Sequence, residues 1–227
     1  METTRVNIVR RYENIIAGGS VLEAFGGAAA IGLAIIGLSQ LAPYLVVSLA
    51  AIALGAALMV ESGLMMAGYS TAVLTSRHPE FAEADLGGGV GLRAIAGLSV
   101  VVLGVLGTLG LFPVVLTAVS AIVLGTALIF STGLAAEVRW VRIEISEGVE
   151  APMEGATRVG VSATTGMQML AGLAAIVLGI IALAGYSPLV LTLIALLAIG
   201  GSILFTGGAV SARMAMLSAH HKAVSAG

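Results

Sequence analysis

The stretch that decides the fold is 94–136, AIAGLSVVVLGVLGTLGLFPVVLTAVSAIVLGTALIFSTGLAA, which carries no charged residue and has Pro113 near its middle. It is about twice as long as the ~20 residues that a helix needs to cross the hydrocarbon core of a bilayer. Proline removes a helical hydrogen bond and disfavours helix in the residue before it, so a turn is expected at Phe112. The stretch therefore predicts two membrane-spanning helices joined by a tight turn.

The same pattern occurs three times along the chain. Two more charge-free runs, 24–60 and 159–212, contain Pro43 and Pro188. Glycine stands twelve residues after, twenty residues after and sixteen residues before each proline, at Gly55, Gly125, Gly200, Gly63, Gly133, Gly208, Gly27, Gly97 and Gly172. Such self-similarity predicts one structural unit used three times. We therefore expect an all-α integral membrane protein with six transmembrane helices in three repeated hairpins, near 21–39, 44–66, 92–109, 114–136, 166–184 and 189–211.

Composition supports the membrane class. The chain is 59% hydrophobic and 10% charged, and its mean hydropathy is +1.10, which is far more apolar than a soluble domain. The apolar segments are continuous rather than alternating, which excludes barrel strands. Cysteine is absent, which excludes disulfides and thiolate sites. The formal net charge of −2 gives no basic surface for nucleic acid.

Charge placement predicts the orientation. All Arg and Lys residues lie outside the expected turns at 40–44, 110–113 and 185–188, which carry no charge. By the positive-inside rule both termini are expected in the cytoplasm, with the chain in the inner membrane. The predicted division is an interfacial segment 1–20, hairpins 21–66, 92–136 and 166–211, cytoplasmic connectors 67–91 and 137–165 (the second acidic), and a cytoplasmic tail 212–227.

Small residues predict where helices pack. The first spans carry Gly27, Gly97, Gly104, Gly172 and Gly179 along one helical face, and the second spans carry Gly55, Gly125 and Gly200. In lipid, such residues allow two helix backbones to approach closely. These contacts join hairpins within one chain, or protomers of a homo-oligomer.

The glycine and proline pattern also resembles a known family. Pro43 with Gly55 and Ser62-Gly63, and the corresponding positions in the other two copies, are similar to those of the HdeD-like acid-resistance membrane proteins. The resemblance covers most of the chain and implies three helical hairpins. It further implies a small prokaryotic inner-membrane protein linked to stress response or membrane integrity, with no catalytic residues to transfer.

Four polar residues form a candidate cluster. Glu23, Arg93 and Gln168 each stand twenty residues before a proline, which is about 30 Å along a helix and so at the cytoplasmic interface. Glu61, eighteen residues after Pro43, lies slightly deeper. We expect Glu23 and Arg93 to pair, with Gln168 bonding either, which fixes the register of the hairpins. The alternative is a role in conduction or ligand binding, because ionisable groups within spans are costly and tend to be functional.

The connectors and the tail carry weaker signals. Acidic side chains in the second connector form either a docking patch for a basic partner or a hydrated segment; they are Glu144, Glu147, Glu150 and Glu154. His78, His220 and His221 are metal-binding candidates or solvated side chains. No grouping of residues suggests acid–base, nucleophilic or metal catalysis, so neither an enzyme activity nor a cofactor is expected.

Three functional hypotheses follow. The first is a non-catalytic, HdeD-like inner-membrane protein with a structural, membrane-organising or stress-related role. The second is an accessory subunit of a larger membrane protein complex, which would use the acidic connector for docking. The third is a channel or transporter for ions or small solutes, which requires polar groups deeper than the interface. Thr117, Ser120, Thr192 and Gln40 are the residues that offer such polarity.

Overall fold

The computed structural model describes residues 24–75, 91–145 and 155–225, and within that part every regular element is a helix. The elements are a short helix Ala24–Leu38, α2 (Pro43–Thr75), α4 (Gly91–Thr108), α5 (Pro113–Ile145), α6 (Gly155–Leu183) and α7 (Pro188–Ser225). The predicted all-α class is confirmed for this part of the chain.

Five of these helices are long and apolar enough to cross a membrane. Their apolar parts are Pro43–Gly63, Gly91–Thr108, Pro113–Ser131, Gly166–Leu183 and Pro188–Thr206. The helix Ala24–Leu38 is apolar but shorter. A bilayer is therefore the environment that suits this chain, because helices satisfy all their backbone hydrogen bonds internally in lipid.

Each hairpin turn ends at a proline, as the sequence predicts. Pro43, Pro113 and Pro188 are the first residues of α2, α5 and α7. Proline suits this position because the backbone N–H that it lacks would make no hydrogen bond within the helix. The residue before each proline has a left-handed backbone, with φ of 45° at Ala42, 41° at Phe112 and 38° at Ser187. Two residues earlier in each turn φ is again positive, at Gln40, Gly110 and Gly185. The three turns thus share the same pattern of positive φ angles.

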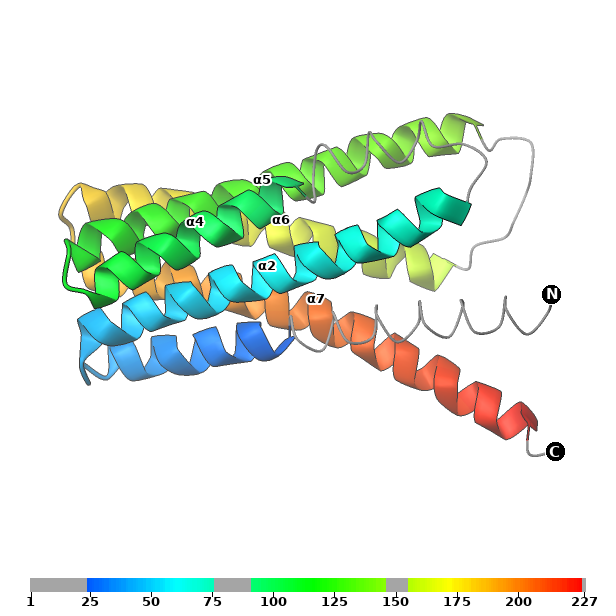
Figure 1. Cartoon of the computed structure of the whole chain (residues 1–227), viewed down its shortest axis with the longest axis horizontal. Coiled ribbons are helices and arrows are strands. Elements are labelled where there is room, and N and C mark those ends of the chain that lie inside the picture. The colour runs from blue at the N-terminus through cyan, green and yellow to red at the C-terminus, as the bar shows by residue number, and fades with distance from the viewer. Residues whose placement is uncertain (1–23, 76–90, 146–154, 226–227) are drawn as a thin grey trace.

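The opposite ends of the helices extend further than the sequence predicts. α2 continues to Thr75, α5 to Ile145 and α7 to Ser225, and α6 begins at Gly155. These ends occupy parts of 67–91, 137–165 and 212–227, which were assigned to connectors and tail. Hydropathy measures the apolar length that matches a bilayer, and a helix continues past that length where no proline stops it. Figure 1 shows the turns gathered at one end of the bundle, while α7 diverges at the other end.

Three central helices hold the core. α2, α5 and α7 pack against one another, and the large side chains between them are less than 2% exposed: Leu54, Leu58, Leu124, Leu128, Ile199 and Ile203. α4 packs against α2 and α5, and α6 packs against α5 and α7. The short helix Ala24–Leu38 packs against α7, where a Cβ built on Gly37 would lie 2.8 Å from Leu193 Cδ2. Each outer helix therefore lies against a central helix of another hairpin.

Pairs of glycines make the contacts between hairpins. A Cβ built on Gly55 would lie 2.7 Å from the carbonyl oxygen of Gly97, and one built on Gly125 would lie 2.5 Å from that of Gly172. A Cβ on Gly27 would lie 2.7 Å from the carbonyl oxygen of Gly200. Gly104 and Gly179 also face central helices, with Cβ positions 3.0 Å from Ser48 O and 3.1 Å from Ala118 O. All eight packing glycines named from the sequence thus lie at helix contacts within the chain.

Gly125→Ala and Gly201→Ala should change stability in opposite directions. The new methyl at 125 meets a backbone oxygen and forces the helices apart, which should lower the free energy of unfolding by about 1–3 kcal/mol. Gly201 has nothing within 4 Å of its Cβ position, so alanine there should raise the free energy of unfolding by up to about 1 kcal/mol through helix propensity. Unfolding of both variants in the same detergent measures the difference. Equal shifts would contradict the assigned packing.

Candidate functional site

A polar cluster lies at the end of the core that is remote from the turns. Glu61 is near the end of the apolar part of α2, and Arg93 is in the first turn of α4. Gln168 is near the start of the apolar part of α6, and Thr206 is the last residue of the apolar part of α7. Because hairpin partners run antiparallel, these starts and ends meet at one level of the bundle.

Direct hydrogen bonds join the four side chains. Arg93 Nη1 donates to Glu61 Oε1 at 2.5 Å, forming an ion pair between α4 and α2. Arg93 Nη2 reaches Gln168 Oε1 at 3.5 Å, and Gln168 Nε2 donates to Thr206 Oγ1 at 3.0 Å. Thr206 Oγ1 in turn donates to the Ser202 carbonyl at 2.9 Å. The cluster therefore connects helices of all three hairpins.

The cluster is more buried than its interfacial position suggested. Glu61 and Gln168 are each 6% exposed, and the Arg93 side chain is 13% exposed. Within the described part of the chain, Glu61 Oε2 and Arg93 Nε are buried without a hydrogen-bond partner. Each such atom costs about 1–3 kcal/mol. A buried pair with this geometry is a weak source of net stability, although removal of one partner is costly.

The structure gives Arg93 an acidic partner, Glu61. The predicted pairing of Arg93 with Glu23 stays a prediction, because Glu23 lies outside the described residues. The predicted contact partner Gln168 does face Arg93. Thr206 was not selected as a site residue. Its signal was its position eighteen residues after Pro188, which matches that of Glu61 after Pro43.

Hydroxyl groups in the core do not form a polar path. Ser48, Thr117, Ser120 and Thr192 are at most 1% exposed. Each donates to the carbonyl four residues earlier in its own helix, at 2.7–3.0 Å. Such bonds satisfy a hydroxyl without linking helices. These groups therefore add little polarity to the interior.

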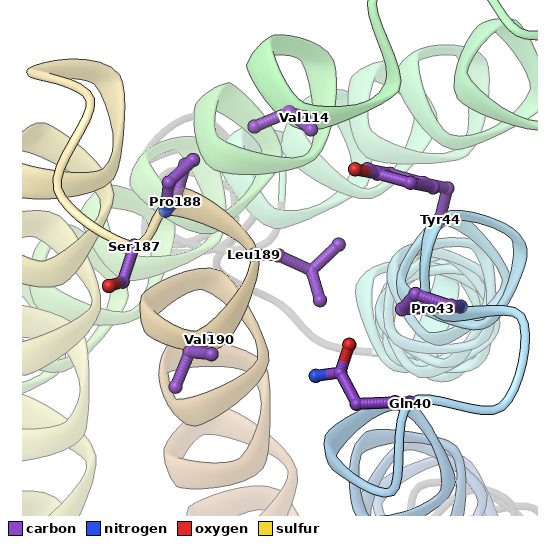
Figure 2. A pocket seen from close by; sticks show the side chains of 8 residues that line it. All are labelled: Gln40, Pro43, Tyr44, Val114, Ser187, Pro188, Leu189 and Val190. Atoms are coloured by element: carbon purple, nitrogen blue, oxygen red, sulfur yellow. The ribbon is translucent and has the colours of Figure 1, made fainter.

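A hollow of about 290 Å³ lies at the turn end, lined by Gln40, Pro43, Tyr44, Val114, Ser187, Pro188, Leu189 and Val190. Figure 2 shows Leu189 and the Gln40 amide directed into the space between the first turns of α2 and α7, while the Ser187 hydroxyl points away. Its lining is mostly apolar and carries no carboxylate or cation. The lining therefore offers no carboxylate or ammonium group for general acid–base chemistry.

The remaining candidates lie elsewhere or outside the described part. Among the described residues no group of three or more His, Asp and Glu side chains could hold a metal ion. Glu144 lies in α5 and His220 and His221 lie in α7; these positions are remote from the cluster along their helices. His78, Glu147, Glu150 and Glu154 lie outside the described residues.

Comparison with protein-family models, with curated proteins and with solved structures finds no match for this chain.

Removal of one member of the ion pair should cost more than removal of both. Arg93→Leu leaves the Glu61 carboxylate buried without a cation and should lower the free energy of unfolding by about 3–5 kcal/mol. Glu61→Leu combined with Arg93→Leu should recover most of that loss. A double-mutant cycle in one detergent measures the coupling.

Thr126→Val is the matched control for this cycle, because Thr126 donates only to its own helix, at the Ile122 carbonyl. It should change stability by less than about 1 kcal/mol. If the effects of the two single changes simply add in the double variant, Glu61 and Arg93 are not coupled.

Proposed function

We propose that this chain is a six-span, three-hairpin inner-membrane protein with both termini in the cytoplasm and a non-catalytic, membrane-organising role. Its hairpins are arranged around a pseudo-threefold axis. The shared turn conformation and the three glycine pairs support the repeat. The glycine and proline pattern supports a relation to HdeD-like proteins and a role in prokaryotic stress response.

The main support for a structural role is that buried apolar side chains fill the centre of the bundle. Leu54, Leu124 and Ile199 are 0% exposed between the central helices, and each stands eleven residues after its proline. Leu58, Leu128 and Ile203 close the next layer. An ion that passed along this axis would lose its hydration among side chains that offer no replacement. The interior thus suits a packed scaffold better than a conduit.

The exposed surface supports placement in a bilayer. Aromatic side chains are exposed at the turn end, at Tyr44, Phe112 and Tyr186, and near the other end, at Phe25, Phe130 and Phe205. Phe130 stands seventeen residues after Pro113, which is about 26 Å along a helix and close to the ~30 Å of the hydrocarbon core. Tyrosine, which joins an apolar ring to a polar hydroxyl, favours the membrane interface, and Tyr44 and Tyr186 therefore support an interfacial position for the turn end. The charge-free turns support an outward-facing turn end.

Reconstitution in liposomes tests the scaffold role against a channel or transporter. Wild-type protein should give no proton, potassium or small-solute flux above protein-free liposomes, and Glu61→Gln should leave that result unchanged. An ionophore added afterwards verifies that the liposomes are sealed. A reproducible flux abolished by Glu61→Gln would make a channel or transporter the leading function.

A specific observation also favours the role of accessory subunit. α2, α5, α6 and α7 all extend past their apolar parts at the same end of the bundle, which is the end remote from the turns in Figure 1. Helices that protrude from a membrane offer surfaces to a partner protein. Glu144 lies at this end, near the last residue of α5. Glu147, Glu150 and Glu154 follow it in the sequence, and this run of carboxylates suits a basic partner.

Purification from native membranes in mild detergent distinguishes these roles. A scaffold should migrate as this chain alone, as a monomer or a homo-oligomer, when its native mass is measured. An accessory subunit should co-purify in fixed proportion with another chain. Truncation of 212–227 should release a partner that docks on the α7 extension, whereas a partner held within the membrane should remain bound.

A further inference from the structure

The glycine contacts leave the cyclic order of the three hairpins undetermined. Each glycine pair joins a central helix of one hairpin to the outer helix of the next: Gly55 with Gly97, Gly125 with Gly172, and Gly200 with Gly27. The paired positions are the same in every case, twelve residues after and sixteen residues before a proline. Gly55 of α2 could therefore pair with Gly172 of α6 as well as with Gly97 of α4.

Chain connectivity does not select the order either. In a ring of three, every hairpin is next to both others, and the two cyclic orders differ only in which face of a hairpin meets which neighbour. The shorter segment between successive hairpins, 146–154, can reach roughly 30 Å, whereas packed helices lie about 8–10 Å apart. Both orders are within reach of the chain.

The polar cluster of Glu61, Arg93, Gln168 and Thr206 distinguishes the two orders. In the observed order α2 faces α4, so Glu61 meets Arg93. In the other order α2 would face α6, so Glu61 would oppose Gln168, and Arg93 would oppose Thr206. The Glu61 carboxylate would then face a helix that carries no cation at this level. The loss of its partner is strongly unfavourable for a buried charge.

The ion pair is poorly optimised as a source of stability. Glu61 Oε2 and Arg93 Nε are both buried without partners in the described part of the chain, and apolar residues of similar volume often stabilise such a site more. A polar pair that contributes little stability can still select one arrangement over another. We infer that the Glu61–Arg93 pair specifies the cyclic order of the hairpins by selecting α4 as the neighbour of α2. This inference depends on the three-hairpin packing and is independent of transport or partners.

The absence of cysteine from the chain allows a direct test. A Cβ on Gly107 would lie 3.4 Å from the Cβ of Ser48, close to the ~3.5–4.5 Å that a disulfide requires. Ser48→Cys with Gly107→Cys therefore reports the observed order. Ala182 occupies in α6 the position that Gly107 occupies in α4, six residues before the proline. Ser48→Cys with Ala182→Cys reports the other order.

Interchange of two side chains should reverse the order. When Glu61, Arg93 and Gln168 are unchanged, mild oxidation should form the 48–107 disulfide within one chain. The 48–182 cysteine pair should stay reduced. Arg93→Gln with Gln168→Arg moves the guanidinium from α4 to α6 and conserves composition and charge. It should close 48–182 and reduce 48–107 at least tenfold. A folded interchange variant that closes 48–107 alone would overturn the inference.

A second variant keeps the inference testable if the interchange variant does not fold. Glu61→Leu with Arg93→Leu removes the selecting charges and retains side-chain volume, so both disulfides should form in a protein that still unfolds cooperatively. Thr126→Val, outside the cluster, should form 48–107 alone. If the Leu–Leu variant also forms 48–107 alone, the ion pair has no part in the order of the hairpins.

Discussion

Close approach of helix backbones at glycine is the constraint on which the rest of this structure depends. In lipid, apolar side chains gain little by leaving one apolar environment for another, so helices associate through contact and interhelical bonds. At Gly55 and Gly97 the carbonyl oxygen of each helix occupies space that a Cβ on the other would need. The same approach at the other two hairpin contacts allows the leucines and isoleucines of α2, α5 and α7 to meet between them.

Closure of the core determines where polar groups can lie. Thr117 and Thr192 sit among buried apolar side chains, and each bonds to its own helix. Glu61 and Arg93 cannot satisfy their charges in that way, and they lie where the apolar parts of their helices end or begin. A charge costs less there than at the centre of the bilayer. The cluster therefore lies at the edge of the apolar core, where a charge is less costly than at its centre.

The sequence predicts some features well because a single residue determines them. Proline cannot continue a helix from the previous residue, so the turns at Ala42, Phe112 and Ser187 follow from sequence. The far ends of α5 and α7 do not, because hydropathy reports apolar length and helices continue beyond it. The pairing of Arg93 with Glu61 does not follow from the sequence either. Repeat position gives depth along the axis but not which helices are neighbours, and Glu61 is expected only slightly deeper than Glu23.

The three helical hairpins carry the same residue at several equivalent positions, so a second feature is needed to distinguish one neighbouring hairpin from another. Positions that repeat without change, such as Gly55 and Gly125, give every hairpin the same packing surface and cannot distinguish one neighbour from another. Discrimination needs a layer where the copies differ in charge as well as size. Eighteen residues after each proline the chain carries Glu61, Ser131 and Thr206. Among these three, Glu61 has the Arg93 guanidinium as its neighbour. One acidic and one basic residue therefore distinguish the α2–α4 interface from the other two.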